Sequence, residues 1–133
     1  MNNAILKQKD RLVKLLSAIN GIIYQEALLH REFIAELNKE QLMIGIDAEG
    51  KDMPDYIEGS LFGTGKINLK DTGDFHAGIQ PLFDDLGIEM WSTDEKTRFL
   101  EPMYDALGLT QESKKMLRDK MKQGIINSIK QKL

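Results

Sequence analysis

The tripeptide Asp-Thr-Gly at residues 71–73 matches the sequence in which aspartic proteases carry a catalytic carboxylate. That chemistry requires two carboxylates that share one proton. This chain has a single copy, so a protease would need a symmetric dimer with a β-rich body, which the helical patterns described below oppose. The same tripeptide favours a turn, because Asp71 and Thr72 can accept backbone hydrogen bonds and Gly73 adopts a positive φ without steric cost. We therefore interpret residues 71–73 as a turn.

The glycine-rich residues 59–67 could in principle cradle a phosphate. A P-loop, however, requires Gly at the position of Ser60 and Ser or Thr at the position of Ile67. The run also precedes a predicted strand instead of linking a strand to a helix, so no helix N-terminus would face the anion. The spacing argues against a nucleotide site.

Metal chemistry is equally poorly supported by the sequence. The acidic residues 47–52 suggest a calcium loop, but Lys51 occupies a ligand position and the glycine comes two positions early. His30 and His76 lie far apart, and neither belongs to a helical pair of ligands. The absence of Cys removes disulfides, thiolate metal sites and Cys nucleophiles together. We expect no metal and no cofactor.

The remaining carboxylates that could serve acid–base catalysis fall at predicted turns and helix caps, where acids are ordinary. No pattern sustains a mechanism of bond cleavage, and we expect that the chain is not an enzyme. These carboxylates are Asp84, Asp85, Asp94 and Glu95.

The length of 133 residues suits one domain with one core, so we expect a single domain over residues 1–133. Its 41% hydrophobic and 29% charged residues are typical of soluble globular proteins. No apolar run approaches the ~20 residues of a membrane span, and the N-terminus lacks the apolar region of a secretory signal. We expect synthesis in a cytoplasm and no membrane partner.

Apolar periodicity predicts two N-terminal helices. The first covers residues 4–19 and ends near Asn20-Gly21, and the second runs from Ile22 to about Ile44. Because an internal Gly costs only about 1 kcal/mol, residues 20–21 could instead weaken one long helix without breaking it.

Residues 45–66 contain five glycines and one proline and show no sustained period. They predict a long flexible loop, which is a candidate for ordering on a partner. Residues 67–70 alternate between apolar and polar and predict a short strand before the turn. Residues 75–83 and 88–92 then predict an antiparallel hairpin, whose first strand lies at an edge because Pro81 cannot donate to a ladder.

Two helices complete the chain. Thr93 or Asp94 is expected to cap a short helix from Glu95 to about Tyr104, and Thr110 is expected to cap a long helix that continues to the end. The fold class is therefore α+β, with N-terminal helices, a small antiparallel sheet with a hairpin, and a long C-terminal helix.

The net charge of -3 is unevenly distributed. Residues 47–58 are acidic and residues 111–133 are basic, which can steer partners or pair subunits head to tail, although a solvated helix face and a polar loop are the commoner explanation. Four residues of the terminal helix form a candidate interface: Lys114, Lys115, Arg118 and Lys122.

The order of three segments, residues 36–42, 45–56 and 67–75, resembles the tailed-bacteriophage virion-morphogenesis family of neck, or tail-completion, proteins. Such proteins have a helix, an Asp-x-x-Gly-x-x-(aromatic or Met)-Pro loop, a flexible stretch, a Leu-x-x-Thr-Gly-x-(Leu or Phe) turn, an antiparallel sheet and a closing helix. The resemblance covers roughly residues 30–130. Its first motif matches Asp47, Gly50, Met53, Pro54 and Tyr56, and its second matches Leu69, Thr72, Gly73 and Phe75.

Two departures from the family pattern stand in this sequence. The family often has a basic, Thr-containing helix between its two motifs, where this chain has residues 57–65, so the resemblance does not identify the docking surface. A small polar residue followed by Ile usually comes after the turn, and here Gly78-Ile79 takes that place.

The resemblance implies a structural role for the matched residues and a structural virion protein of the head-tail junction. Its partners would be copies of itself in a ring, together with phage connector and tail proteins, and it would be located in the virion neck after synthesis in the host cytoplasm. One alternative is a small nucleic-acid-binding or regulatory module that uses the lysine-rich C-terminal helix on phosphates, although no interleaved aromatic supports base readout. A further alternative is an enzyme with a phosphate or metal ligand.

Overall fold

The computed structural model describes residues 3–61, 63, 65–84 and 87–132. They form two compact units. The helical unit comprises the described residues up to His30 and from Arg118 onward, and the mixed unit comprises Arg31–Leu117. The α+β class is confirmed: the chain has a long N-terminal helix, a second helix, an antiparallel hairpin and a long C-terminal helix.

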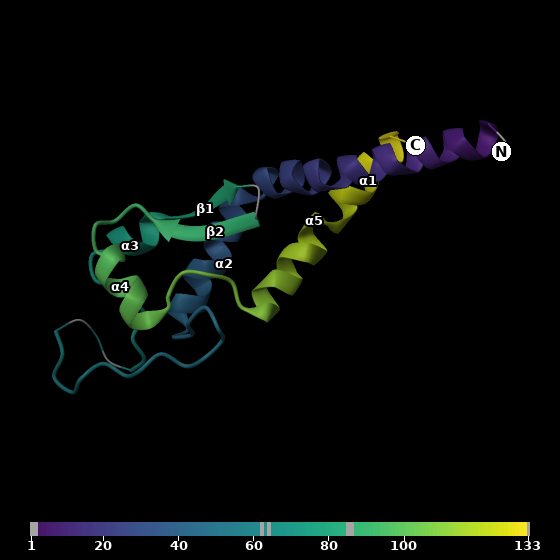
Figure 1. Ribbon diagram of the computed structural model, residues 1–133. Helices are drawn as coiled ribbons and strands as arrows, with labels where there is room; N and C mark the ends of the chain where they lie inside the picture. The colour runs from purple at the N-terminus through teal and green to yellow at the C-terminus, as the bar shows by residue number, and fades with distance from the viewer. Residues whose placement is uncertain (1–2, 62, 64, 85–86, 133) are drawn as a thin grey trace. The chain divides into compact units, whose positions relative to one another are not determined.

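The helical unit contains α1 (Asn3–Leu29) and the later turns of α5 (Gln111–Lys132). Gly124 of α5 lies directly against the Glu26 carboxylate of α1, where any larger side chain would collide with it. Lys132 lines a groove together with residues of α1 between Gln8 and Ala18. The end of α5 therefore lies beside α1, yellow against purple in Figure 1.

Of the two possibilities at Asn20-Gly21, a helix end there is wrong and the alternative that the helix continues is confirmed, because α1 runs through Gly21 to Leu29. Gly21 is exposed, and a Cβ at this position would meet no packed neighbour within 4 Å, so its penalty is only that of glycine in a helix interior. Apolar neighbours such as Ile22, which is buried, offset that penalty. The real boundary is at His30, whose N–H bonds to the Ala27 carbonyl three residues back.

In the mixed unit, α2 (Arg31–Met43) packs against β1 (Ile79–Asp84), which pairs with β2 (Gly87–Ser92) in an antiparallel hairpin. The predicted hairpin is confirmed; its turn residues 85 and 86 lie outside the described residues. Pro81, opposite Met90, lies in an edge strand as expected. The buried apolar side chains of this unit come from α2, α3, both strands, α5 and the connections between the elements: Ile34, Ala35, Leu37, Leu42, Met53, Phe75, Ile79, Met90, Ala106, Leu107 and Leu117.

The strand predicted at residues 67–70 is not formed, and only an isolated bridge joins Lys66 to Asp55. Leu69 adopts a left-handed φ of 60°, and the Lys70 N–H turns back to the Asn68 Oδ1. These two features bend the backbone away from the extended conformation that a strand requires. The segment after the turn begins as a one-turn helix, α3 (Asp74–Ala77), and not as a strand.

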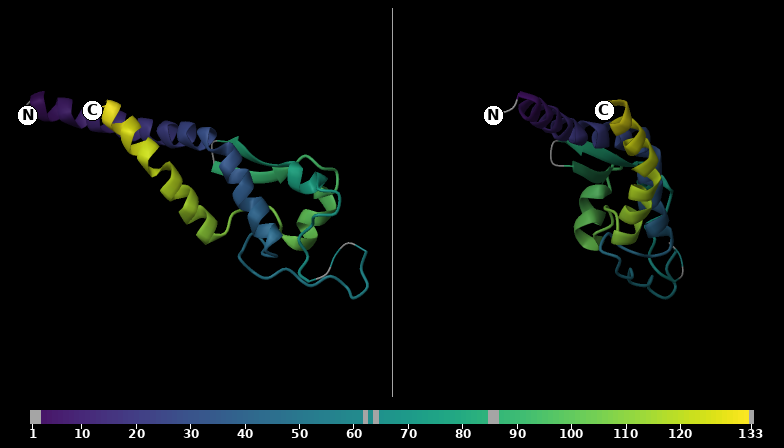
Figure 2. Two further views of the ribbon diagram at one scale, coloured as in Figure 1. Left: turned by 180° about the vertical axis from the view of Figure 1, so that it is seen from behind. Right: turned by 90° about the vertical axis from the view of Figure 1, so that its right-hand side faces the viewer.

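Two further helices follow the hairpin. α4 (Thr97–Tyr104) starts two residues later than expected; Asp94 still contributes, because its Oδ1 accepts the Lys96 N–H at 2.8 Å. The predicted cap at Thr110 is confirmed, since its Oγ1 accepts the Ser113 N–H at 3.1 Å in the first turn of α5. Figure 2 shows the long connection between α2 and α3 looping out beyond the C-terminal end of α2.

Candidate functional site

The turn at residues 71–73 positions α3. Gly73 has a φ of 91° and caps the helix, and the Thr72 hydroxyl accepts the Asp74 N–H at 3.3 Å. A left-handed φ is sterically costly for any residue with a Cβ, which explains glycine here. Phe75 then enters the core, only 2% exposed, and its carbonyl accepts the Ser92 hydroxyl at 2.8 Å. The turn therefore places Phe75 beside the hairpin, where its carbonyl is held by Ser92 of β2.

The first motif forms a compact turn of its own. Asp47 Oδ1 accepts the N–H groups of Glu49 and Lys51, each at 2.9 Å, and Gly50 supplies a φ of 86°. The chain then returns beneath α2, where the Met53 N–H bonds to the Gly45 carbonyl and the Met53 side chain is buried. The carboxylate at 47 is thus occupied with backbone donors and serves structure.

Asn68 joins the two motifs. Its Oδ1 accepts the Tyr56 hydroxyl at 3.2 Å, while its carbonyl accepts the Nε2–H of His76 at 2.6 Å. His76 is only 6% exposed, and burial lowers the pKa of its imidazole more than the Asn68 bond raises it. A neutral histidine on α3 therefore holds the segment that carries Asn68, and Asn68 holds Tyr56.

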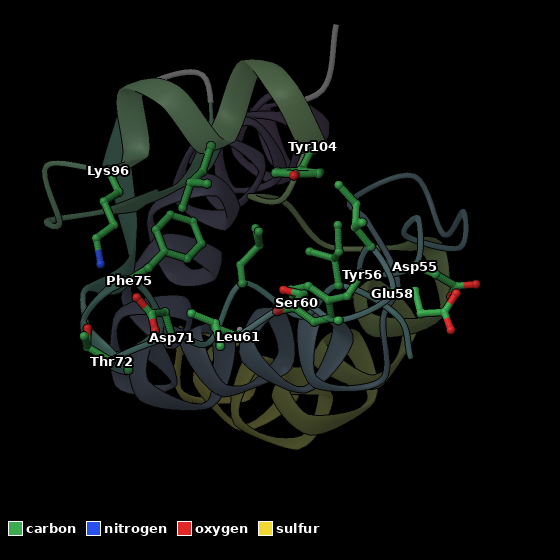
Figure 3. Close-up of a pocket in the computed structure, with 16 residues that line it drawn as sticks. Asp55, Tyr56, Glu58, Ser60, Leu61, Asp71, Thr72, Phe75, Lys96 and Tyr104 are labelled. Atoms are coloured by element: carbon green, nitrogen blue, oxygen red, sulfur yellow. The ribbon is translucent and has the colours of Figure 1, made fainter. Parts of the chain in front are cut away.

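A cavity of about 640 Å³ lies between this loop system and α4. Most of its lining is apolar or aromatic, contributed by residues 55–61, by residues 67–75 and by Leu100 and Tyr104 of α4. Figure 3 shows Phe75 and Leu61 on one side of the cavity and Tyr104 across from them. Such walls bind apolar side chains or an apolar ligand.

Charged groups are confined to the two ends of the cavity. Asp55 and Glu58 lie at one end with their carboxylates directed away from it, and Lys96, Asp71 and Thr72 lie at the other (Figure 3). No ion pair of the described residues involves any of these groups. Charges at an entrance orient a partner, whereas the interior supplies the apolar contact.

The rim of the cavity is unusually apolar for a surface. Ile57 is 85% exposed and Leu61 is 97% exposed, although both line the cavity. On α4, the neighbouring Phe99 and Met103 are also exposed. Exposed apolar side chains gathered around a hollow are typical of an interaction site.

The structure brings five of the motif residues to this cavity and leaves the others apart. Asp47, Gly50, Met53 and Pro54 do not line it. The interface candidates Lys114, Lys115, Arg118 and Lys122 are exposed on α5 and do not line it either. The five that converge are Tyr56, Leu69, Thr72, Gly73 and Phe75.

A second group of carboxylates lies outside the cavity. Burial raises the pKa of Glu101, whose Oε2 accepts the Leu107 N–H at 2.8 Å. Burial, and then the charges of Glu49 and Asp47, raise the pKa of Asp105. Among the described residues, no group of three or more His, Cys, Asp or Glu could hold a metal ion. The Glu101 carboxylate holds the segment that follows α4 through its hydrogen bond to the Leu107 N–H.

Sequence reasoning missed Asn38, Gln41 and Asn68, which hold the loops. Asn38 and Gln41 lie on the buried face of α2 and bond to the backbone of residues 106–110. One feature of the sequence could have indicated this role: Asn38 and Gln41 are three residues apart among the apolar residues of one helix face. Side-chain amides that are buried need hydrogen-bond partners.

Comparison with protein-family models, with curated proteins and with solved structures finds no significant match. One helix of the described residues, α1, is long and apolar enough to cross a membrane by length and composition alone. Helices of soluble proteins pass the same test, and Lys14 and Glu26 interrupt this one.

Proposed function

We propose that the chain is a non-enzymatic structural protein of the phage head-tail junction, assembling as a ring between connector and tail. The observation that carries this proposal is the convergence of Tyr56, from the first matched motif, with Leu69, Thr72, Gly73 and Phe75, from the second, on one apolar cavity. An apolar cavity with charged groups at its ends is suited to receiving part of another protein.

The chemistry of the cavity favours a docking role over catalysis. A catalytic site needs a nucleophile or base within hydrogen-bond reach of an orienting partner. The acidic and basic side chains form one group at each end of the cavity, no ion pair of the described residues joins any of them, and the Tyr56 hydroxyl donates to Asn68. An apolar socket stabilises an inserted side chain in proportion to the area that it removes from water.

A ring requires a heterologous contact, in which one surface of a subunit meets a different surface of its neighbour. The cavity provides one such surface. If neighbouring subunits contact each other through the cavity, the same cavity lies at every subunit interface, which suits a closed ring of identical subunits.

The proposal is tested by assembly of the purified protein. Negative-stain electron microscopy and sedimentation at increasing concentration should reveal closed rings, alone or upon addition of purified connector. A protein that stays monomeric at every salt concentration, even beside connector and tail proteins, would contradict the ring. In an infected cell, loss of the chain should leave filled heads and tails that do not join.

A second candidate function is nucleic-acid binding through α5. Lys114, Lys115, Arg118 and Lys122 are all exposed, and their spacing places them on one face of the helix. Titration with duplex DNA discriminates the two functions, because phosphate binding weakens steeply as salt rises. A nucleotide or metal enzyme would instead show a raised thermal midpoint with its ligand, and we expect none.

A further inference from the structure

A tight turn in the loop between α2 and α3 presents apolar side chains to solvent. The Ser60 N–H donates to the Ile57 carbonyl at 2.9 Å, and Gly59 has a φ of 80°, the positive value that a type II turn requires at its third position. Ile57 before the turn is 85% exposed, and Leu61 after it is 97% exposed. We call Ile57, Glu58 and Leu61 the knob.

The backbone holds the knob at its base. Two hydrogen bonds of 2.8 Å join residues 54–56 to residues 65–67. The carboxylates of Asp55 and Glu58 are directed away from the cavity (Figure 3), and no ion pair of the described residues involves either of them. The knob is therefore a pre-formed apolar projection with two acids beside it, and a pre-formed segment loses little conformational entropy on binding.

The helical unit contains a groove of complementary character. It has a volume of about 670 Å³ and lies where the end of α5 meets the first half of α1. Apolar side chains, cations and one amide line the groove, and none of its described lining residues is acidic. The spacing of the α1 members by three and four residues places them on one face of the helix. The apolar members are Leu12, Leu15 and Ala18, and the cations are Arg11, Lys14 and Lys132.

The acids of α1 do not neutralise this groove. Asp10 does not line it, and Glu26, eight residues beyond Ala18, bonds to His30 at 3.1 Å. No ion pair of the described residues involves the three cations of the groove. The groove therefore offers apolar contact and positive charge together.

We infer that the knob of one copy inserts into the groove of a second copy. This inference rests on the proposed function and names the two surfaces of its ring contact, which are the rim of the cavity and the groove. The apolar side chains of the knob meet the apolar lining of the groove, and this contact removes both from water. The acids beside the knob face the cations, which have no acid of their own in the groove.

Other occupants satisfy only part of the groove. A nucleic acid would bring phosphates to the cations but would leave Leu12 and Leu15 without apolar contact. An uncharged apolar peptide would bury the cations without a partner, which is costly. The knob supplies both kinds of contact. Residues of the same chain cover neither surface, since Leu12 is 59% exposed and the knob is more exposed still.

Each copy carries one knob and one groove, so the contact propagates head to tail. This property gives the test. Ile57→Lys damages the knob and keeps the groove, whereas Leu12→Lys damages the groove and keeps the knob; both positions are exposed. Val13→Lys on α1 and Ile44→Lys after α2 are the matched controls, because both replace exposed apolar side chains outside the two surfaces.

Sedimentation velocity at low salt should show that the wild type and both controls associate as concentration rises. Ile57→Lys and Leu12→Lys should each weaken association about tenfold or more, which corresponds to the loss of one buried apolar side chain. An equimolar mixture of these two variants should give a dimer and nothing larger, because it contains one intact knob and one intact groove for each pair of chains.

Charge reversal tests the electrostatic part of the contact. Arg11→Glu and Glu58→Arg should each weaken association, and the two changes combined in one chain should restore most of it. Lys9→Glu makes the same reversal on α1 at an exposed position that does not line the groove, so association should persist in this control. A double variant as weak as either single variant would contradict the pairing of these two charges.

Several results would overturn the inference. One is association of Leu12→Lys equal to that of the wild type; another is a mixture that stays monomeric while circular dichroism shows both variants folded. Binding of a monomeric wild type to duplex DNA or to anionic vesicles, lost in Arg11→Glu, would assign the groove to those anions instead. Rings in Leu12→Lys would remove the groove from the contact and leave the proposed function standing, whereas an absence of rings in the wild type, even with connector, would remove both.

Discussion

Asn38 and Gln41 lie one turn apart on the buried face of α2 and together bind four backbone groups of residues 106–110. The Asn38 amide donates to the Ala106 carbonyl and accepts the Gly108 N–H, both at 2.9 Å. The Gln41 amide donates to the Gly108 carbonyl at 2.8 Å and accepts the Thr110 N–H at 3.0 Å. Two side chains thus act as a substitute for a neighbouring strand, and they hold the segment between α4 and α5.

Replacing Asn38 should therefore be strongly destabilising. Asn38→Leu leaves the Ala106 carbonyl and the Gly108 N–H unpaired in a site that is 0% exposed. Each buried group without a partner costs about 1–3 kcal/mol, so with two such groups the free energy of unfolding should fall by roughly 2–6 kcal/mol. Urea denaturation measures this change. The exposed substitution Glu40→Ala on the same helix should change the free energy of unfolding by less than about 0.5 kcal/mol. Equal effects from both variants would contradict the role of the Asn38 hydrogen bonds.

Removing the Tyr56 hydroxyl should loosen the cavity without unfolding the protein. Tyr56→Phe deletes the bond to Asn68 and should cost about 0.5–1.5 kcal/mol. Hydrogen exchange should accelerate at the amides of Tyr56 and Ile67, whose partners are the Gly65 and Pro54 carbonyls. Tyr104→Phe is the matched control, because this second phenol lines the cavity with no hydrogen bond in the described structure. Faster exchange in the control alone would contradict the role of Asn68.

His76 should make stability fall in mild acid. Burial, with smaller effects from the charges of Lys70 and Lys39, places its folded pKa below the unfolded value near 6.5. The unfolded chain therefore binds the proton more tightly, so stability is full above pH 6.5 and is lost as the pH falls from there toward the lowered folded pKa. A single proton gives a slope of at most about 1.4 kcal/mol per pH unit.

The measurement is the urea midpoint between pH 8 and pH 5, compared with His76→Gln. The variant keeps a donor for the Asn68 carbonyl and lacks the titration, so its profile should be flatter over this range. Parallel profiles for the two proteins would show that another group causes the dependence.

Glu101 should oppose folding at neutral pH through its charge while supporting it through its hydrogen bond. Burial raises the pKa of Glu101 above 4.5, so the folded state holds the proton more tightly than the unfolded state does. The contribution of this group to stability therefore declines as the pH rises from 4.5 through the raised folded pKa. Glu101→Gln retains an acceptor for the Leu107 N–H without the charge and should be as stable as the wild type, or more so, at pH 7.

Glu101→Leu removes the acceptor as well and should lower the free energy of unfolding by about 1–3 kcal/mol. Thermal unfolding of the two variants, with the exposed Glu95→Gln as a control, separates charge from hydrogen bonding. A Gln variant as unstable as the Leu variant would show that the carboxylate charge itself is favourable.

Local patterns in the sequence determined the elements whose signals lie within a few residues. Thr110 is a helix cap because its hydroxyl reaches an amide three residues on, and Gly73 forms the turn because only glycine adopts its φ freely. The hairpin at residues 79–92 follows from alternation on either side of a turn. Five of the cavity residues, including Tyr56 and Phe75, also stood in sequence motifs.

The tertiary structure alone decided what depends on distant partners. Residues 67–70 alternate like a strand, yet they form none, and Asn68 is bonded to Tyr56 and His76. Gly21 was ambiguous because its penalty is small compared with the packing of the side chains around it. The partners of Asn38 lie 68 and 70 residues away, and no local periodicity encodes a hydrogen bond across such a separation.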